Sequence, residues 1–273
     1  MNRSFVEKLW NASPASLVRA AQRRLSPKHG QQWFEVRGGP LKGVEILLPG
    51  QTDAWGEMIA GTFDHFIYDQ LTHCGALQNK VIWDVGAHFG YHSLAFAQLG
   101  ATVKAFEPNS ANLDVLNQNL KRNPRLAARI QTCTTALSNA DGATTFNASL
   151  SIDGSSSGSH LANAQTPYSA ETVAQFQQVT VRAARADSIV RTKELPPPDY
   201  IKVDVEGAEA MVLQGATQLL KEHRPTLFIE VHHICVMCDL RVILDNAGYS
   251  VEILDRDQAS PSRCFIYAYP QRA

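Results

Sequence analysis

The chain has 273 residues, 44% of them hydrophobic, and its 25 basic and 26 acidic side chains give a formal net charge of −1 at pH 7. This length and apolar content suffice for one sizeable domain with an extension, and the balanced charge argues against a general nucleic-acid-binding protein. No apolar run approaches the roughly 18 residues of a membrane span, the polar, basic N-terminus lacks the pattern of a secretory signal, and the five cysteines show no framework spacing. We therefore expect a cytoplasmic protein.

Residues 1–75 are expected to form an extension of the main domain. Within residues 1–30 there are six basic side chains and one acid, and Ser13-Pro14 marks the start of a short amphipathic helix. We expect this helix to pack on its own domain, with peripheral contact to an anionic membrane surface as the alternative. Alternating apolar residues around Gly38-Gly39-Pro40 predict a hairpin. Residues 54–71 predict one helix whose aromatic side chains cover an edge of the ligand site.

Residues 80–90 predict a buried strand followed by a glycine loop, and a helix comes next. Gly86 and Gly90 let the backbone pass close to a ligand, because a Cβ would fill the space that the ligand needs. His88 stands where a dinucleotide site has its middle glycine. Asp84 would repel a pyrophosphate but suits a ligand that carries an ammonium and a sulfonium, such as S-adenosylmethionine (SAM).

A second carboxylate is expected to belong to the same ligand site. Residues 101–106 predict the next strand, and Glu107 follows it, 21 residues after Gly86. An acid at the end of the second strand of a doubly wound sheet is placed to accept two ribose hydroxyls. Enzymes that bind dinucleotides and enzymes that bind SAM share this feature.

The remaining elements alternate between strands and helices, which predicts a parallel sheet with right-handed crossovers. The last two strands are joined by a turn alone and predict one antiparallel edge. Asp187 is expected to cap a short helix. The predicted strands are 130–137, 143–146, 178–182, 200–205, 225–231, 251–254 and 264–269, and the predicted helices run through Leu113 to Leu120, through Met211 to Leu220, and up to Gly248.

Residues 147–180 differ in composition from the rest of the chain. They are rich in Ser, Ala, Gln, Asn and Gly, and only Asp153 and Glu171 are charged. A long segment of this kind inside a compact domain is a lid, a binding loop or disorder. Composition leaves these alternatives open.

Five sequence blocks resemble, in order, those of FkbM-type SAM-dependent methyltransferases. They are Asp84-Val-Gly-Ala-His-Phe-Gly90, Phe106-Glu-Pro108, Ala136-Leu-Ser138 with Gly142, Ile201-Lys-Val-Asp-Val-Glu-Gly-Ala-Glu209 and residues 225–230. The resemblance covers about residues 40–270 and departs at His88, where Asn is usual, and at Asp64, where Glu is common. It implies an α/β class I methyltransferase fold for residues 76–273: a Rossmann-like, mostly parallel seven-stranded sheet with an antiparallel edge strand.

The resemblance also implies ligand roles. Gly86 and Gly90 would lie against the methionine part of SAM, Glu107 would bind the ribose, and the Ala136 region would lie near adenine. Characterised members of the family methylate hydroxyls on natural products and sugars. Kinship therefore implies O-methylation of a sugar, glycolipid or natural-product acceptor.

The candidate catalytic groups lie at strand ends, where ligands of open α/β sheets bind. Asp204 is the first candidate for the base that removes the acceptor's proton, His232 is the second, and Glu206 is expected to orient the loop or the substrate. With Glu230 these groups offer ligands for a divalent cation such as Mg²⁺. Because adjacent strand residues point to opposite faces, we do not expect all four to converge.

Two other functions remain as alternatives. An NAD-dependent oxidoreductase would share Glu107 but requires the loop glycine that is absent. A catalytically silent SAM-binding protein would keep the glycine loop without needing an acid at position 204. The sequence indicates a small-molecule or glycan acceptor, and it names neither that acceptor nor the oligomeric state.

Overall fold

The computed structural model describes residues 30–49, 53–75, 77–149, 158–166, 169–256 and 264–271. The basic helix expected near the N-terminus lies outside these residues. Within them, no helix has the length and apolar character that crossing a membrane requires.

A seven-stranded sheet forms the centre of the molecule, with strand order β12-β13-β11-β10-β3-β4-β5. All of the neighbouring pairs are parallel except the two that involve β13. The strands are β3 (Val81–Val85), β4 (Thr102–Phe106), β5 (Ile130–Cys133), β10 (Tyr200–Val203), β11 (Thr226–Val231), β12 (Tyr249–Arg256) and β13 (Cys264–Pro270).

The antiparallel strand is therefore one position inside the sheet, and the edge strand is β12. The crossover through α12 (Ile234–Asn246) carries the chain from β11 past one strand position to β12. β13 then returns and fills the gap, antiparallel to both neighbours. The prediction of a mostly parallel sheet with one antiparallel strand is confirmed, but that strand is not at the edge.

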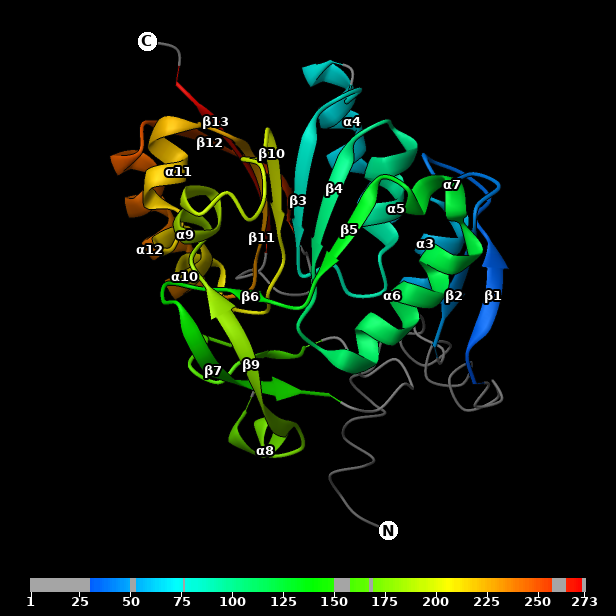
Figure 1. Cartoon of the computed structure of the whole chain (residues 1–273), viewed down its shortest axis with the longest axis horizontal. Helices are drawn as coiled ribbons and strands as arrows, with labels where there is room; N and C mark the ends of the chain where they lie inside the picture. Colours follow the sequence, from blue (N-terminus) through cyan, green and yellow to red (C-terminus); the bar gives the residue numbers. More distant parts are fainter. Residues whose placement is uncertain are drawn as a thin grey trace, which may run out of the picture.

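Helices cover both faces of the sheet, and Figure 1 shows the two sets on opposite sides. One apolar core includes Leu94 and Phe96 of α5, and the other includes Val212 of α10 and Leu240 of α12. The first set is α5 (Tyr91–Gln98), α6 (Ser110–Arg122) and α7 (Pro124–Ala127), and the second is α9 (Ala186–Arg191), α10 (Glu209–Gln214), α11 (Thr217–Glu222) and α12.

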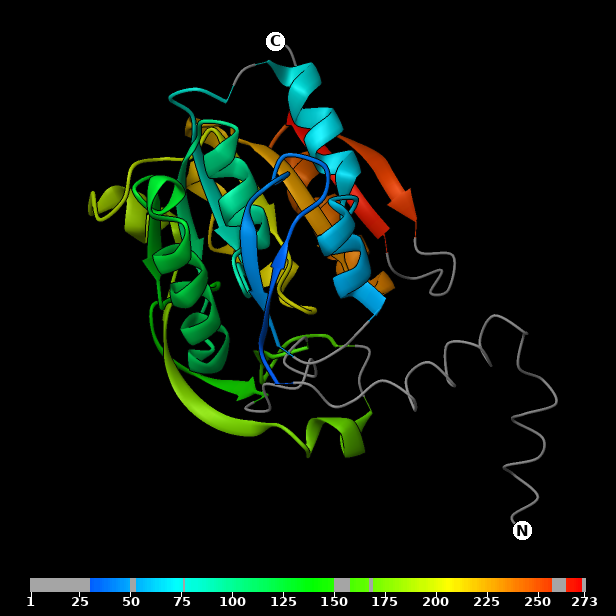
Figure 2. The ribbon, with the colours of Figure 1, turned by 90° about the vertical axis from the view of Figure 1, so that its right-hand side faces the viewer.

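The N-terminal hairpin is present as β1 (Gln32–Glu35) and β2 (Glu45–Leu48), which pair antiparallel. The backbone N–H of Leu47 donates to Asn119 of α6 at 2.6 Å, and that of Arg37 donates to the carbonyl of Ile59 at 2.8 Å. Figure 2 shows the hairpin between α6 and α3 (Asp53–Ala60). Its buried residues share one core with the sheet, although the domain boundary at residue 75 stays a prediction.

The single helix predicted over residues 54–71 is two helices, α3 (Asp53–Ala60) and α4 (His65–Cys74). The chain breaks at Gly61, whose φ is +80°, and a Cβ there would lie 2.1 Å from the carbonyl oxygen of Gly38. Gly61 therefore turns the chain where it passes the hairpin, a contact that the helical pattern does not reveal.

The strand predicted over residues 130–137 is also divided. β5 ends at Cys133, and β6 (Ala136–Leu137) belongs to a second, four-stranded sheet with the order β6-β9-β7-β8. Figure 1 shows this small sheet below the central one. The described part of residues 147–180 thus carries regular structure: the end of β7, β8, α8 and the first half of β9. The new elements are β7 (Gly142–Ala148), β8 (His160–Leu161), α8 (Ala170–Val173) and β9 (Gln177–Ala184).

Asp187 caps a different helix from the one expected. It lies in the first turn of α9, whose N-cap is Arg185, but its carboxylate accepts hydrogen bonds from the backbone of Gln218 and Leu219 in α11. The helix predicted through residues 211–220 is split at Gly215, where a Cβ would lie 2.0 Å from the carbonyl oxygen of Ser138. Tertiary contact decides both features.

Candidate active site

Adjacent parallel strands of the central sheet end at one edge, and the predicted site residues lie there. The glycine loop follows β3, Glu107 follows β4 and Asp204 follows β10, while Glu230 and His232 lie at the end of β11. Strand order reverses between β3 and β10. This is the position at which open α/β sheets bind their ligands.

The two loop glycines are required by packing inside the protein. Gly86 and Gly90 have φ values of +80° and +84°. A Cβ on Gly86 would lie 1.8 Å from the carbonyl oxygen of Asp204, and one on Gly90 would lie 3.1 Å from the side chain of Leu116. The prediction assigned this space to a ligand. At Gly86 the backbone of the neighbouring strand end occupies it instead.

Glu107 is buried directly after β4, and backbone groups hold both of its carboxylate oxygens. Oε2 accepts from the N–H of His88 and Oε1 from the N–H of Asn109, each at 2.8 Å. Burial raises the pKa of Glu107 to about 7, although these hydrogen bonds act in the opposite direction. The side chain of Asn112 also hydrogen-bonds to this carboxylate. A carboxylate has about four acceptor positions, so one remains for a further donor such as a ribose hydroxyl.

Aromatic side chains surround the glycine loop. The His88 ring stacks on Phe89 at 3.6 Å between centroids, and Trp55 of α3 lies 5.6 Å from Phe89. Burial lowers the pKa of His88 to about 4, so its ring is neutral at pH 7. Nε2 of His92 in α5 donates to Oδ2 of Asp64 at 3.1 Å. The segment between the hairpin and β3 thus reaches the loop, as its aromatic residues predict.

Asp84 lies fully buried beneath the loop. Its Oδ2 accepts from the hydroxyl of Ser93, and its Oδ1 lies 3.6 Å from Nζ of Lys202. A direct contact between Asp84 and the ammonium of SAM stays a prediction, as does contact of adenine with Ala136, which is buried in β6.

Lys202 joins the glycine loop to Asp204, a role that the sequence did not suggest. Its buried Nζ donates to the carbonyl of Gly86 at 3.1 Å and to Oδ2 of Asp204 at 3.2 Å. Burial opposes the charge, but Asp204 and Asp84 outweigh burial and raise the pKa of Lys202. The lysine therefore fixes the proposed base beside the loop.

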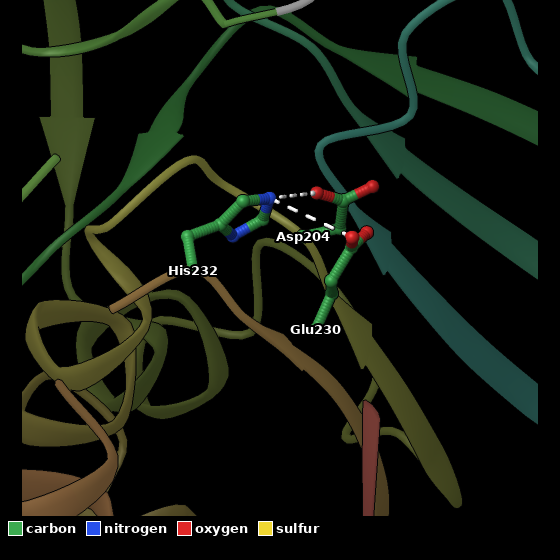
Figure 3. Close-up of side chains that lie close together, drawn as sticks. All are labelled: Asp204, Glu230 and His232. Atoms are coloured by element: carbon green, nitrogen blue, oxygen red, sulfur yellow. Dashed lines mark ion pairs between the residues drawn. The ribbon is translucent and has the colours of Figure 1, made fainter. Parts of the chain in front are cut away.

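His232 lies among carboxylates, as Figure 3 shows for two of them. Its Nε2 lies 3.5 Å from Glu206, 3.6 Å from Asp204 and 3.8 Å from Glu230. Three of the four candidate cation ligands, Asp204, Glu230 and His232, bring ligand atoms within 4.8 Å of one another, and Glu206 is not in that group. Glu230 lies in β11 and His232 follows the last residue of that strand, and their side chains lie on the same side. Glu206, with φ of +53°, turns back toward them.

Glu209 is a site residue that the sequence reasoning missed. Its fully buried Oε1 lies 2.7 Å from Nδ1 of His232 and accepts from the N–H of Gly207 at 2.9 Å. The ring therefore presents Nε2 to Asp204 and Glu230. In the sequence, Glu209 is the last acid of the block Ile201 to Glu209. Its position at the start of a helix gave no indication that it contacts His232.

The electrostatics of His232 follow from these neighbours. Burial disfavours the charged ring, but the hydrogen bond to Glu209 and the charges of Glu206 and Glu230 outweigh burial and raise the pKa of His232 to about 10. Among the described residues, Nε2 has no hydrogen-bond partner, although three carboxylate oxygens lie 3.5–3.8 Å from it.

An open, mostly parallel sheet, with a glycine loop at the reversal of strand order and a buried acid directly after the next strand, is typical of α/β proteins that bind a nucleoside-containing cofactor. Residues 84–251 match the methyltransferase FkbM domain, and the chain belongs to this family. It is a SAM-dependent methyltransferase with the class I fold. Membership removes the NAD-dependent oxidoreductase alternative.

The chain is similar to several described proteins. It is 30% identical to the hexuronic acid methyltransferase AglP of Haloferax volcanii over 185 residues, 67% of this chain and 70% of that protein. Among solved structures, methyltransferase FkbM from Methylobacillus flagellatus KT is 18% identical with a TM-score of 0.49, and the match covers 81% of this chain and 56% of that one. Magnesium protoporphyrin IX methyltransferase from Synechocystis PCC 6803, solved with SAM bound, is 14% identical with a TM-score of 0.49, covering 81% and 86%.

Proposed function

We propose that the protein transfers the methyl group of SAM to a hydroxyl of a sugar, with Asp204 as the group that orients that hydroxyl and accepts its proton. One observation carries the proposal: Nζ of Lys202 bridges the carbonyl of Gly86 and the carboxylate of Asp204, at 3.1 and 3.2 Å. An acid is thereby held against the loop on which the methionine part of SAM is expected to lie.

The reaction is an in-line displacement at the methyl carbon. The O–CH₃ bond forms as the S–CH₃ bond breaks, SAM leaves as S-adenosylhomocysteine, and the hydroxyl proton passes to Asp204. Alignment of acceptor and methyl supplies much of the acceleration in such a step. Asp204 is accessible for this role, with 28% of its side chain exposed, whereas the side chain of His232 is 3% exposed. His232 is the alternative base, but its pKa of about 10 keeps the ring protonated at pH 7, which favours Asp204. Glu206 is proposed to position the acceptor.

A hexuronic acid is the acceptor class that we propose. The support is the similarity to AglP, whose description is hexuronic acid methyltransferase. The test is methyl transfer from labelled SAM to uronic-acid oligosaccharides, matched neutral sugars, lipid alcohols and polyketide alcohols. Preferential labelling of the uronic acids is expected. Transfer to a non-hydroxyl atom would contradict the proposal, and SAM binding without any transfer would instead fit a silent SAM-binding protein.

Glu107→Ala is expected to weaken SAM binding by about 10- to 150-fold, since hydrogen bonds to a charged group contribute roughly 1.5–3 kcal/mol. In the wild type, SAM affinity should also fall as the pH drops below 7. Binding favours the charged carboxylate, and the pKa of Glu107 is about 7, so protonation competes with SAM below that pH. Isothermal titration between pH 5.5 and 8.5 measures both effects.

The exposed Glu222 of α11 provides the control for this titration. Glu222→Ala should leave SAM affinity and its pH dependence unchanged. Equal SAM affinity in Glu107→Ala and Glu222→Ala would rule out the ribose role of Glu107.

We further propose that part of the insertion at residues 147–180 acts as a lid. The N–H of Gln165 donates to the carbonyl of Gly207 at 3.1 Å, and a Cβ on Gly207 would lie 2.3 Å from the carbonyl oxygen of Gln165. The segment after β8 thus packs on the turn that carries Glu206. Amide hydrogen exchange at residues 158–166 should slow when SAM and an acceptor analogue bind. Equal exchange with and without these ligands would refute the lid.

A further inference from the structure

Three side chains from neighbouring strands bring ligand atoms together at the carboxyl edge of the sheet. Asp204 follows β10, Glu230 lies in β11, His232 comes directly after that strand, and one ligand atom from each lies within 4.8 Å of the other two. Nε2 of His232 is 3.6 Å from Oδ1 of Asp204 and 3.8 Å from Oε1 of Glu230. Around a cation with bonds of about 2.1 Å, neighbouring donors lie roughly 3.0–3.4 Å apart. A small inward movement of the carboxylates reaches that spacing.

The histidine has the second contact that metal-binding histidines usually make. Its Nδ1 lies 2.7 Å from the fully buried Glu209, which fixes the ring orientation and tautomer. Its Nε2 is buried, has no hydrogen-bond partner among the described residues, and points at Asp204 and Glu230 (Figure 3). The buried Nε2 therefore faces two carboxylates while Glu209 fixes the ring through Nδ1, which is the arrangement expected of a metal-binding histidine.

We propose that Asp204, Glu230 and His232 bind one divalent transition-metal cation, for which Mn²⁺ is the best match, and that this cation holds the acceptor hydroxyl. Two carboxylates and one imidazole suit Mn²⁺, which takes oxygen ligands readily and tolerates nitrogen, whereas Mg²⁺ prefers oxygen ligands and water. The part of the inference that concerns the acceptor rests on the proposed function.

Such a cation would serve two purposes in the site: it would acidify the acceptor alcohol and would neutralise negative charge. A carboxylate is a weak base toward an alcohol, and a cation that binds the alcohol oxygen lowers its pKa, so that the proton can pass to Asp204 as the O–CH₃ bond forms. A hexuronate also carries a negative charge into a site that contains Asp204, Glu206 and Glu230. A divalent cation offsets that repulsion and can bind the acceptor's own carboxylate.

The alternative is that no metal binds and that a protonated His232 ring, together with Lys202, balances the carboxylates. Mn²⁺ binding to the full chain separates the two readings. Electron paramagnetic resonance of MnCl₂ titrations should show one tight site per chain, and electron spin echo modulation should show coupling to one imidazole nitrogen. Glu230→Gln should weaken Mn²⁺ binding at least tenfold, and His232→Ala should abolish the nitrogen coupling.

Glu252→Gln, the same change at an exposed position of β12, is the matched control and should bind Mn²⁺ like the wild type. If Glu230→Gln does not fold, the nitrogen coupling in the wild-type chain still decides. Absence of a tight Mn²⁺ site, or a site without nitrogen coupling, overturns the inference. Full-rate methylation of a uronic acid by such a metal-free chain would leave the proposed function standing. A nitrogen-coupled Mn²⁺ site in a chain that methylates no hydroxyl would refute the proposed function and keep the metal site.

Discussion

Asp204→Asn is expected to lower kcat by about 10²- to 10⁴-fold, the usual cost of losing a general base. The amide keeps the shape of the side chain, and its oxygen can still accept the hydrogen bond from Lys202. It cannot take up the proton of the acceptor. SAM affinity should stay within a few-fold of the wild type, because the expected anchors of SAM are the glycine loop and Glu107. Steady-state kinetics with a hexuronic acid acceptor and SAM titration measure the two effects.

The matched control is Asp245→Asn on α12, where the carboxylate is 47% exposed and pairs with Arg241. Its kcat should equal that of the wild type. If Asp204→Asn turns over at the wild-type rate across pH while His232→Ala is inactive, then His232 is the base and the role assigned to Asp204 is wrong.

Gly86→Ala is expected to destabilise the folded protein by about 3–5 kcal/mol, the range of severe single substitutions. The methyl group would lie 1.8 Å from the carbonyl oxygen of Asp204 and 2.9 Å from its carbonyl carbon. Both are backbone atoms at a strand end, so relief requires the sheet to move. The positive φ adds a further cost for any residue with a Cβ. Urea unfolding followed by circular dichroism gives the free energy of unfolding.

Gly56→Ala separates this contact from the general effect of replacing a glycine. Gly56 lies in α3, and a Cβ there would meet no atom within 4 Å. Alanine at that position should change the free energy of unfolding by less than about 1 kcal/mol, toward greater stability. If Gly86→Ala were as stable as Gly56→Ala, the close approach between the glycine loop and Asp204 could not be correct.

Local patterns predicted the elements that build the cofactor half of the site. The apolar run before Gly86, the helix after Gly90 and the acid at position 107 can each be read within a few residues, and the structure has β3, α5 and Glu107 as expected. The N-terminal hairpin was equally readable, because its apolar residues alternate with period two around a glycine turn.

Local patterns failed where distant segments touch. The break between α3 and α4 lies where Gly61 meets Gly38, and the break between α10 and α11 lies where Gly215 meets Ser138. Neither contact changes the periodicity of the sequence. The strand predicted over residues 130–137 was divided for the same reason, since apolar content does not reveal which of two sheets each half joins.

The sequence by itself determined the fold class, the glycine loop and the acids at the strand ends, because helical and strand periodicities and turn residues act over short distances. Only the tertiary structure decided how those acids combine. It placed Lys202 between Gly86 and Asp204, and it set Glu209 behind His232. These contacts depend on strand order and on the direction of buried side chains, which are settled when the sheet packs and are not encoded in any one segment.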